Sequence, residues 1–236
     1  MSITDWTTFR VILMFTLLPL GIYNALLYLQ PFTISIFAID GIIIVRLGNI
    51  GYHRWLTHKQ FEANNIGRKV MLTSMLLSGL TPPGHYVHAH LNHHKFSDQP
   101  GDPHSPKELG FIRYFFGRYA PTGTVFMRYY MQQKDAVALT KNYWDMYIAL
   151  WVLFLIIQPW LAVWLVFMFC WGWVGTLYLN WAGHGGKAGE PTNLGLFSNI
   201  YLGGEDYHKN HHENPGKLMM GENDFSAKYI IPWLSK

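Results

Sequence analysis

The chain has 236 residues, of which 50% are hydrophobic, 17% aromatic and only 14% charged, whereas soluble domains carry about 25% charged residues. This composition favours a membrane protein over an ordinary soluble domain. The net charge of +4 is spread along the chain, which gives little support to a nucleic-acid partner. The single cysteine, Cys170, excludes an internal disulfide framework, and the opening residues lack the basic n-region of a signal peptide.

Apolar runs, taken in chain order, predict four membrane-spanning helices paired as two hairpins. About 20 apolar residues are needed to cross the hydrocarbon of a bilayer. The predicted spans cover residues 11–29, 32–52, 147–158 and 160–181. Short turns at Pro31 and Pro159 join the members of each pair. Met71 to Leu80 is also apolar but too short to cross, and it favours a re-entrant or interfacial helix.

Lysine and arginine residues predict on which side of the membrane each segment lies. All 18 fall outside the two hairpin turns, and cytoplasmic segments collect basic residues. We therefore expect an integral, multi-pass protein with both termini and the polar segments 53–142 and 183–236 on the cytoplasmic side. The expected fold is an all-α membrane protein in which residues 1–236 form one domain with a helical cytoplasmic cap. Gly110 to Gln133, which mixes aromatic and arginine residues, suits a segment on the membrane surface and equally an ordinary loop.

The 12 histidines are not scattered along the chain. Four short motifs, HRWLTH, HLNHH, NWAGH and HKNHH, carry His53, His58, His90, His93, His94, His184, His208, His211 and His212. Residues at i, i+3 and i+4 share one helix face, so each triplet predicts a tripod of imidazoles. His53 and His58 are five residues apart, which on a regular α-helix separates them by about 140°. They converge only if the helix is distorted there, or else each binds a different metal ion.

These histidines predict a dinuclear metal site on the cytoplasmic side. A lone histidine on an apolar face is usually a core residue, but two identical triplets, a pair and one more histidine on one side are poorly explained by packing. Neutral imidazole is a good ligand for iron, zinc, copper and nickel, and nine are too many for one ion. Four nearby acids can accept the outer ring N–H groups and fix each tautomer: Asp98, Asp102, Glu205 and Asp206.

The motifs together resemble those of the membrane fatty acyl desaturases, in particular the delta-9 group. HRWLTH resembles the first histidine box, HLNHHKFSDQPGDPHSP the second with its tail, and GGEDYHKNHHENP the third. NWAGH resembles the motif that supplies a ninth histidine and a water-bound asparagine. The resemblance covers nearly the whole chain, and it implies that the nine histidines bind iron and that Asn180 holds a water on one iron. Lys209 and Asn210 depart from the usual third box, and His85 and His88 stand where acyl-CoA enzymes often carry headgroup contacts.

The resemblance implies an oxygen-dependent enzyme that introduces a cis double bond, of delta-9 type, into a saturated long-chain acyl-CoA or acyl-lipid. It also implies two ferrous ions, which zinc can replace in a recombinant sample, and electrons from ferredoxin or from cytochrome b5 with its reductase. Membrane lipid is an expected partner and nucleic acid is not. Two other functions stay open: a related histidine-rich di-iron hydroxylase or oxygenase, and a non-enzymatic zinc-binding membrane protein.

A tunnel for the acyl chain is expected along the second predicted span, because His53 lies at its cytoplasmic end. Gly41 is twelve residues before His53, which places it about 18 Å deeper on a straight helix. Gly48 lies nearer the histidines, where a missing side chain would let an acyl chain pass close to the backbone. Tyr86 is a candidate ring at the entrance. Close helix packing explains such glycines equally well, and packing is the alternative role for Tyr86.

Overall fold

The computed structural model describes residues 31–115, 124–186 and 189–236. Within these ranges the secondary structure is helical apart from a single bridge between Ala63 and Ser235. The elements are α2 (Pro31–Asn49), the π-helix η1 (Ile50–Thr57), α3 (Asn65–Ser78), α4 (Pro83–Phe96), α5 (Pro106–Phe115), α6 (Arg128–Gln132), α7 (Lys134–Ile157), α8 (Pro159–Gly183), α9 (Leu196–Leu202), α10 (His208–Glu213), the π-helix η3 (Ser226–Ile230) and α11 (Ile231–Leu234). The all-α prediction is therefore confirmed for the described ranges.

Two stretches in this part of the chain are long and apolar enough to cross a membrane, judged by length and composition alone. They are Thr33–Thr57 and Pro159–Gly183, with 25 residues each. The predicted span 147–158 forms the second half of α7, which begins at Lys134 among polar residues, and the predicted span 11–29 lies outside the described residues. Two apolar helices are consistent with a membrane protein, whereas the arrangement of four spans stays a prediction.

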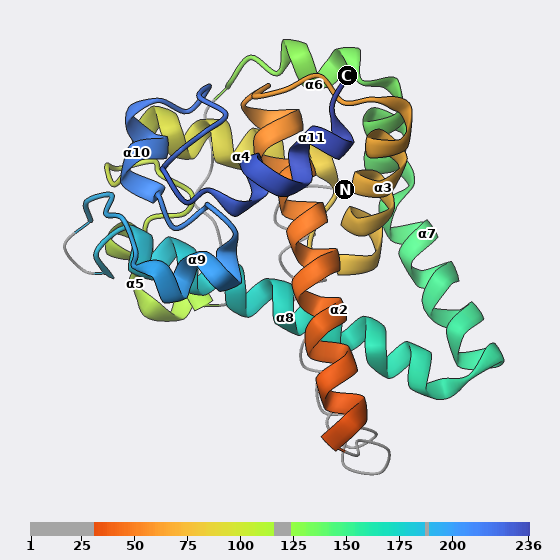
Figure 1. The fold of residues 1–236 in the computed structure, drawn as a ribbon. Helices are drawn as coiled ribbons and strands as arrows, with labels where there is room; N and C mark the ends of the chain where they lie inside the picture. The colour runs from red at the N-terminus through yellow and green to blue at the C-terminus, as the bar shows by residue number, and fades with distance from the viewer. Residues whose placement is uncertain (1–30, 116–123, 187–188) are drawn as a thin grey trace.

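Helices α7 and α8 form the hairpin that the sequence predicts, and α2 descends beside α8 (Figure 1). Gln158 is extended between them, and Pro159 begins α8, where proline loses no helical hydrogen bond and its fixed φ suits the first turn. The outer faces of these helices carry exposed isoleucines, including Ile39 on α2 and Ile156 on α7. Large exposed apolar surface of this kind is typical of a lipid or protein contact.

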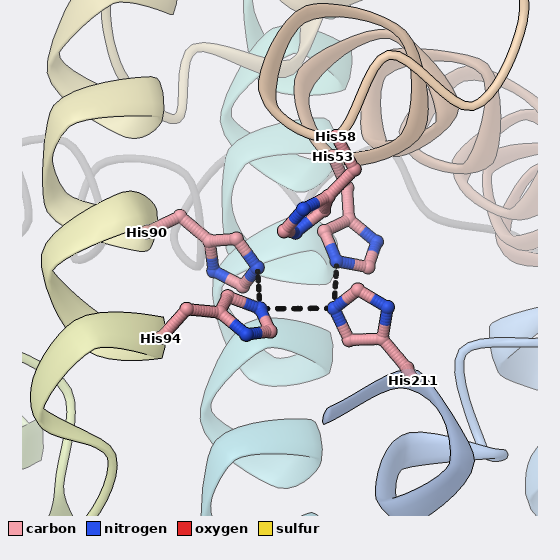
Figure 2. A group of neighbouring side chains, drawn as sticks. All are labelled: His53, His58, His90, His94 and His211. Atoms are coloured by element: carbon pink, nitrogen blue, oxygen red, sulfur yellow. Dashed lines mark hydrogen bonds between the residues drawn. The ribbon is translucent and has the colours of Figure 1, made fainter. Parts of the chain in front are cut away.

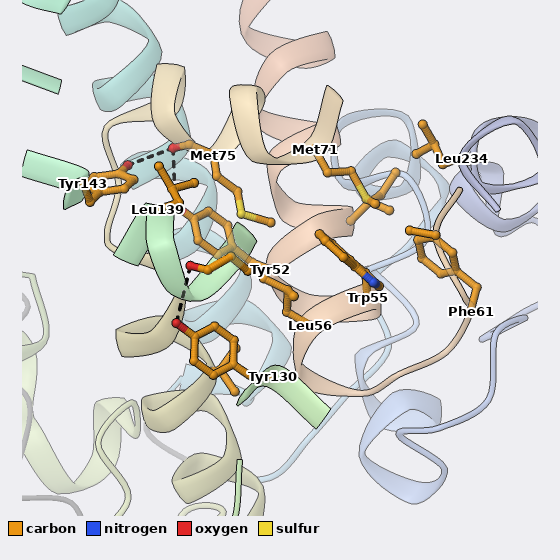
Figure 3. Packing of buried hydrophobic residues seen from close by; sticks show 14 of the residues in the cluster. Tyr52, Trp55, Leu56, Phe61, Met71, Met75, Tyr130, Leu139, Tyr143 and Leu234 are labelled. Atoms are coloured by element: carbon orange, nitrogen blue, oxygen red, sulfur yellow. Dashed lines mark hydrogen bonds between the residues drawn. The ribbon is translucent and has the colours of Figure 1, made fainter. Parts of the chain in front are cut away.

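The cap packs around a core of aromatic and sulfur-containing side chains from η1, α3 and α7 (Figure 3). Met75 lies at its centre, fully buried, and its carbonyl oxygen accepts hydrogen bonds from the hydroxyls of Tyr143 at 2.8 Å and Tyr52 at 3.3 Å. Gly51 makes this packing possible, because a Cβ there would collide with the side chain of Met75. The apolar run from Met71, predicted to be re-entrant or interfacial, thus forms the second half of a helix that holds η1 in place.

Local signals explain where α3 begins and ends. The side chain of Asn64 accepts a hydrogen bond from the N–H of Gly67 at 2.7 Å, as an N-cap does. Gly79 follows the helix at φ +64°, the left-handed conformation that glycine adopts at helix C-termini without steric cost. Asn64 also donates to the carbonyl oxygen of Ser235 at 2.9 Å, so the end of the chain is fastened to the same helix.

Candidate metal centre

The structure gathers the nine histidines of the four motifs into two groups that could each hold a metal ion. Within each group, one potential ligand atom per histidine lies within 4.8 Å of every other. The first group, drawn in Figure 2, consists of His53, His58, His90, His94 and His211. The second consists of His93, His184, His208 and His212. The nine histidines come from four segments: η1, α4, the end of α8, and α10. The site therefore forms only when these segments pack together.

The π-helix η1 explains how His53 and His58 come to the same group. The backbone N–H of His58 donates to the carbonyl oxygen of His53 at 3.1 Å, an i to i+5 hydrogen bond that closes one π-helical turn. Residues five apart therefore lie one turn apart on one face, and the two rings are in edge-to-face contact with centroids 4.9 Å apart. The helix is therefore distorted between His53 and His58. Because both histidines fall in the same five-histidine group, the grouping does not support a separate metal ion for each.

Each histidine triplet is divided between the two groups, which differs from the predicted tripods. On α4, His90 and His94 are four residues apart, and their Nε2 atoms lie 3.1 Å apart in the first group, while His93 belongs to the second. On α10 the division is reversed: the Nε2 atoms of His208 and His212 lie 3.2 Å apart in the second group. In each triplet, the two histidines four residues apart lie on the same helix face and belong to one group. The remaining histidine, His93 or His211, belongs to the other group.

The hydrogen bonds of the second group direct Nε2 atoms of its histidines toward one another, as in a site that holds a metal ion. Nδ1 of His93 lies 2.8 Å from Oδ1 of Asp102, and Nδ1 of His184 lies 2.7 Å from Oδ2 of Asp98. These nitrogens must carry the protons, because an ionised carboxylate only accepts. The Nε2 lone pairs then point inward, where Nε2 of His184 is only 2.8 Å from Nε2 of His208. A metal ion satisfies such lone pairs together.

The distances also fit a metal ion. Two nitrogens bound to one ion at about 2.1 Å, and at a right angle, lie about 3.0 Å apart. In the first group, Nε2 of His211 lies 2.9 Å from that of His53 and 3.0 Å from that of His94 (Figure 2). Among the residues that the structure describes, the buried Nε2 of His58 has no hydrogen-bonding partner. The two groups therefore fit metal ions in both distance and donor chemistry.

Burial and neighbouring histidines lower the pKa values of several of these imidazoles and so favour their neutral form. Burial, followed by the neighbouring histidines, lowers the pKa of His94 and of His212 to about 2. The same causes place the pKa values of His90 and His208 well below the ordinary histidine value. A histidine binds metal only through an unprotonated nitrogen, so these side chains are held in the state that a ligand requires.

The sequence profile of the fatty acid desaturase family matches residues 27–218. The chain belongs to that family. A protein of Arabidopsis thaliana called delta-9 desaturase-like 2 is 33% identical over 229 residues, which cover 88% of this chain and 75% of the relative. An acyl-CoA 5-desaturase of Anemone leveillei is 24% identical, covering 93% of this chain and 72% of its own length. The predicted family and enzyme class are confirmed: this is an oxidoreductase that desaturates fatty acyl chains.

Three of the four predicted acids contact the histidines of the desaturase. Besides Asp98 and Asp102, Oε2 of Glu205 lies 2.6 Å from Nδ1 of His53. Burial opposes ionisation of Glu205, but Arg54 and His53 outweigh it and lower its pKa to about 2, so the carboxylate stays charged. These acids can orient the rings and raise their basicity, as outer partners of metal-binding histidines do.

The fourth acid, Asp206, has a different role from the one predicted. Its Oδ1 accepts hydrogen bonds from Nδ2 of Asn199 at 3.0 Å and from the N–H of Gly204 at 3.1 Å. Through these hydrogen bonds Asp206 joins the turn before α10 to Asn199 of α9. Sequence proximity to the third histidine box did not distinguish Asp206 from Glu205, because neighbouring residues in a turn can point in opposite directions.

Asp102→Asn is expected to weaken metal binding or turnover of the desaturase by about 10–100-fold, the usual cost of losing an outer partner. Asp102 is fully buried, and its carboxylate accepts hydrogen bonds from His93 and from the backbone N–H groups of Asp98 and His104. The side-chain NH₂ of an asparagine at this position would face one of these donors and lose that hydrogen bond. Asp206→Asn should stay near the parent, because one amide oxygen can replace Oδ1. Metal content and turnover of both variants check this. Equal losses in the two variants would return Asp206 to the metal centre.

A cavity runs between α2 and α8 from the histidines towards the deeper part of both helices. Its empty space, including the part open to solvent, is about 1080 Å³. Its lining includes His53 and His208 at one end and Gly41 and Trp171 at the other. An acyl chain in this cavity would lie beside the histidine groups.

The predicted tunnel residues fall in different places. Gly41, Tyr86 and Asn180 line the cavity, and the Tyr86 ring stacks on that of His90 with centroids 5.4 Å apart. Gly48 instead faces α3, where a Cβ would lie 3.4 Å from the backbone oxygen of Ser74. Gly48 thus lies at the contact with α3 and not in the lining of the cavity, which favours the packing alternative.

Two cavity residues were missed by the sequence reasoning. Trp171, on α8, fills the space that Gly41 leaves, since a Cβ on Gly41 would lie 2.9 Å from Cγ of Trp171. His104 also lines the cavity, and its ring lies 5.6 Å from that of His93, centroid to centroid. The Asp-Pro-His tail of the second box was a signal for His104, whereas nothing local distinguished Trp171 from the other tryptophans of α8.

Proposed function

We propose that this chain is an oxygen-dependent fatty acyl desaturase with one iron ion in each histidine group, which introduces a cis double bond of delta-9 type. The observation that carries the proposal is the pairing of two largely buried histidine groups with a mainly apolar cavity between α2 and α8. When bound, iron would activate dioxygen, and dioxygen is the oxidant that removes two hydrogens from adjacent, otherwise unreactive methylenes. The first group supports iron over zinc, because its five histidines exceed the four ligands of a typical structural zinc site.

The residues of the chain have three tasks in this reaction. Asp98, Asp102 and Glu205 orient histidine rings, and the apolar walls of the cavity exclude water from the reacting methylenes. Asn180, which lines the same cavity as His208, would hold a water next to the second group. Because methylenes have no polar handle, the depth of the cavity must select the position of the double bond. The delta-9 position is supported by the 33% identical delta-9 desaturase-like relative.

We place the histidine groups and both termini on the cytoplasmic side of a multi-pass membrane protein, in contact with membrane lipid. Electrons would come from a small carrier, ferredoxin or cytochrome b5. Lys95 and Lys209 are exposed and lie next to His94 and His208 in the chain, so exposed positive charges flank two of the histidine motifs. Such charges favour an acidic carrier by electrostatic steering.

Anaerobically purified protein is expected to contain two iron ions per chain and, with oxygen and an electron carrier, to convert a saturated long-chain acyl substrate into the cis-9 alkene. Metal analysis and mass spectrometry of derivatised products provide the test. An alcohol product would favour the related hydroxylases. Protein that binds only zinc and takes up no oxygen under any loading condition would contradict the proposal. A cis alkene at another carbon would overturn only the delta-9 assignment.

A further inference from the structure

Arg54 is a fully buried cation in the middle of η1, directly after His53. Its Nε lies 2.6 Å from Oε1 of Glu205. Its two terminal nitrogens lie 2.9 Å and 3.1 Å from the two carboxylate oxygens of Asp224. One guanidinium therefore joins two buried carboxylates that come from distant parts of the chain. Leaving any one of these three charges unpaired would be strongly unfavourable.

Asp224 belongs to the segment after α10, which the family profile, ending at residue 218, does not cover. The carboxylate is fully buried and also accepts from the N–H groups of Met220 at 3.1 Å and Ala227 at 3.0 Å. These bonds hold the turn that leads into η3 in one conformation. Asp224 is thus rigidly placed before it contacts Arg54.

Gly204 allows Asp224 to approach so closely. It adopts φ +113°, and a Cβ there would collide with the carboxylate of Asp224 and lie 2.7 Å from a terminal nitrogen of Arg54. Both the conformation and the space require glycine. Gly204 immediately precedes Glu205. The close approach at Gly204 therefore also positions the backbone from which the Glu205 side chain extends.

The contacts form one continuous chain from Asp224 through Arg54 and Glu205 to Nδ1 of His53. Each link is 2.6 to 3.1 Å long, and all four residues are at most 3% exposed. A carboxylate on the outer nitrogen of a metal-binding histidine fixes the ring orientation and raises its basicity. A segment more than 160 residues further along the chain thereby reaches a histidine of the first group.

We propose that Arg54 and Asp224 are positioning residues of the metal centre, which hold Glu205 against His53 so that the five-histidine group keeps its ion. This inference rests on the proposed function in one respect, namely that this group binds iron. Without Asp224, the guanidinium keeps a single carboxylate partner and Glu205 loses its fixed orientation. The four-histidine group makes no contact with this chain of side chains and should be affected far less.

The test measures how fast iron leaves the anaerobically loaded, full-length protein when a chromogenic ferrous chelator is added. The parent should release two equivalents slowly. Asp224→Asn should release one equivalent about 10–100-fold faster, the typical cost of losing an outer partner, and the second at the parent rate. Asp135→Asn is the matched control, because Asp135 forms the same two-oxygen pair with Arg68, at 2.6 and 3.0 Å, outside both histidine groups. It should release iron like the parent.

A double-mutant cycle separates positioning from general destabilisation. If Asp224 acts through Glu205, Asp224→Asn adds little to the faster release already seen in Glu205→Gln, because interacting residues give non-additive effects. Fully additive effects, or parent-like release from Asp224→Asn, would overturn the proposal. If Asp224→Asn does not fold, Arg54→Lys replaces it in the iron-release measurement. It keeps the charge but loses the two-pronged geometry, and parent-like iron release from this variant would equally overturn the proposal.

Zinc release, measured in the same way, makes the inference independent of the iron assignment. If the parent binds zinc but no iron, the iron in the proposed function fails, and the same acceleration of zinc release in Asp224→Asn still supports the positioning role. If the parent binds two irons and both Asp224→Asn and Arg54→Lys release them at the parent rate, the positioning role fails alone.

Discussion

His211→Ala is expected to abolish desaturation and to release the ion of the first histidine group. His211 is 1% exposed, and its Nε2 lies 2.9 Å from that of His53 and 3.0 Å from that of His94. Its removal opens the centre of the five-histidine group. The loss should exceed the 10–100-fold that is typical even for an outer partner. Iron content and product formation, measured on membrane-inserted protein, check this.

His85→Ala is the matched control for that experiment. His85 belongs to α4, like three of the nine histidines, but it is in neither histidine group. This variant should keep its iron and much of its activity. Full desaturation in His211→Ala would refute the assignment of the first group, and iron loss in His85→Ala as severe as in His211→Ala would show that the site extends further along α4.

Gly41→Tyr is expected to shorten the acyl chains that the enzyme accepts while leaving its iron content unchanged. Gly41 lines the cavity beside Trp171, and a Cβ at this position already lies 2.9 Å from the tryptophan ring. A tyrosine must therefore displace Trp171 or occupy the deep end of the cavity. One methylene too many in an apolar pocket is worth about 1–3 kcal/mol, or 10–200-fold in specificity. Activity on the longest accepted chain should fall by a factor in that range relative to shorter chains.

Product profiles with saturated substrates of graded length measure the effect. Gly195→Tyr is the matched control, since Gly195 is exposed, has φ −78°, and has open space around the position of a Cβ. It should leave the length preference unchanged. An unchanged preference in an iron-loaded Gly41→Tyr protein would place Gly41 in the packing between α2 and α8 instead of at the end of the acyl cavity.

The composition of the metal centre could be read from the sequence because it depends on local chemistry. The triplets at 90–94 and 208–212 follow helical spacing, and neutral imidazole has few roles that need nine copies on one side of a protein. The same local information identified Asp98, Asp102 and Glu205 as partners. It failed for Asp206, which fastens Asn199 and Gly204, because the direction of a side chain in a turn depends on what packs against it.

The arrangement of the centre was decided by tertiary contacts. The five-residue spacing of His53 and His58 left open a distorted helix or a separate metal ion for each histidine. The structure has a π-helical turn there, in a helix that packs against α3 where Gly51 meets Met71 and Met75. The division of each triplet between two groups depends on how α4 and α10 face each other. Local spacing sets which residues share a helix face, and it carries no information on what lies opposite.

Long-range pairing explains the remaining differences. From the sequence alone, Gly41 and Gly48 were equivalent, yet one borders the cavity at Trp171 and the other packs on the backbone of α3. Arg54 and Asp224 lie 170 positions apart and gave no sign of their contact, since a lone arginine and a lone aspartate occur in any chain. The sequence by itself determined the histidine donor set and the helical, apolar character of the chain. Only the tertiary structure decided which charges meet and where the acyl cavity ends, because both depend on surfaces brought together by folding.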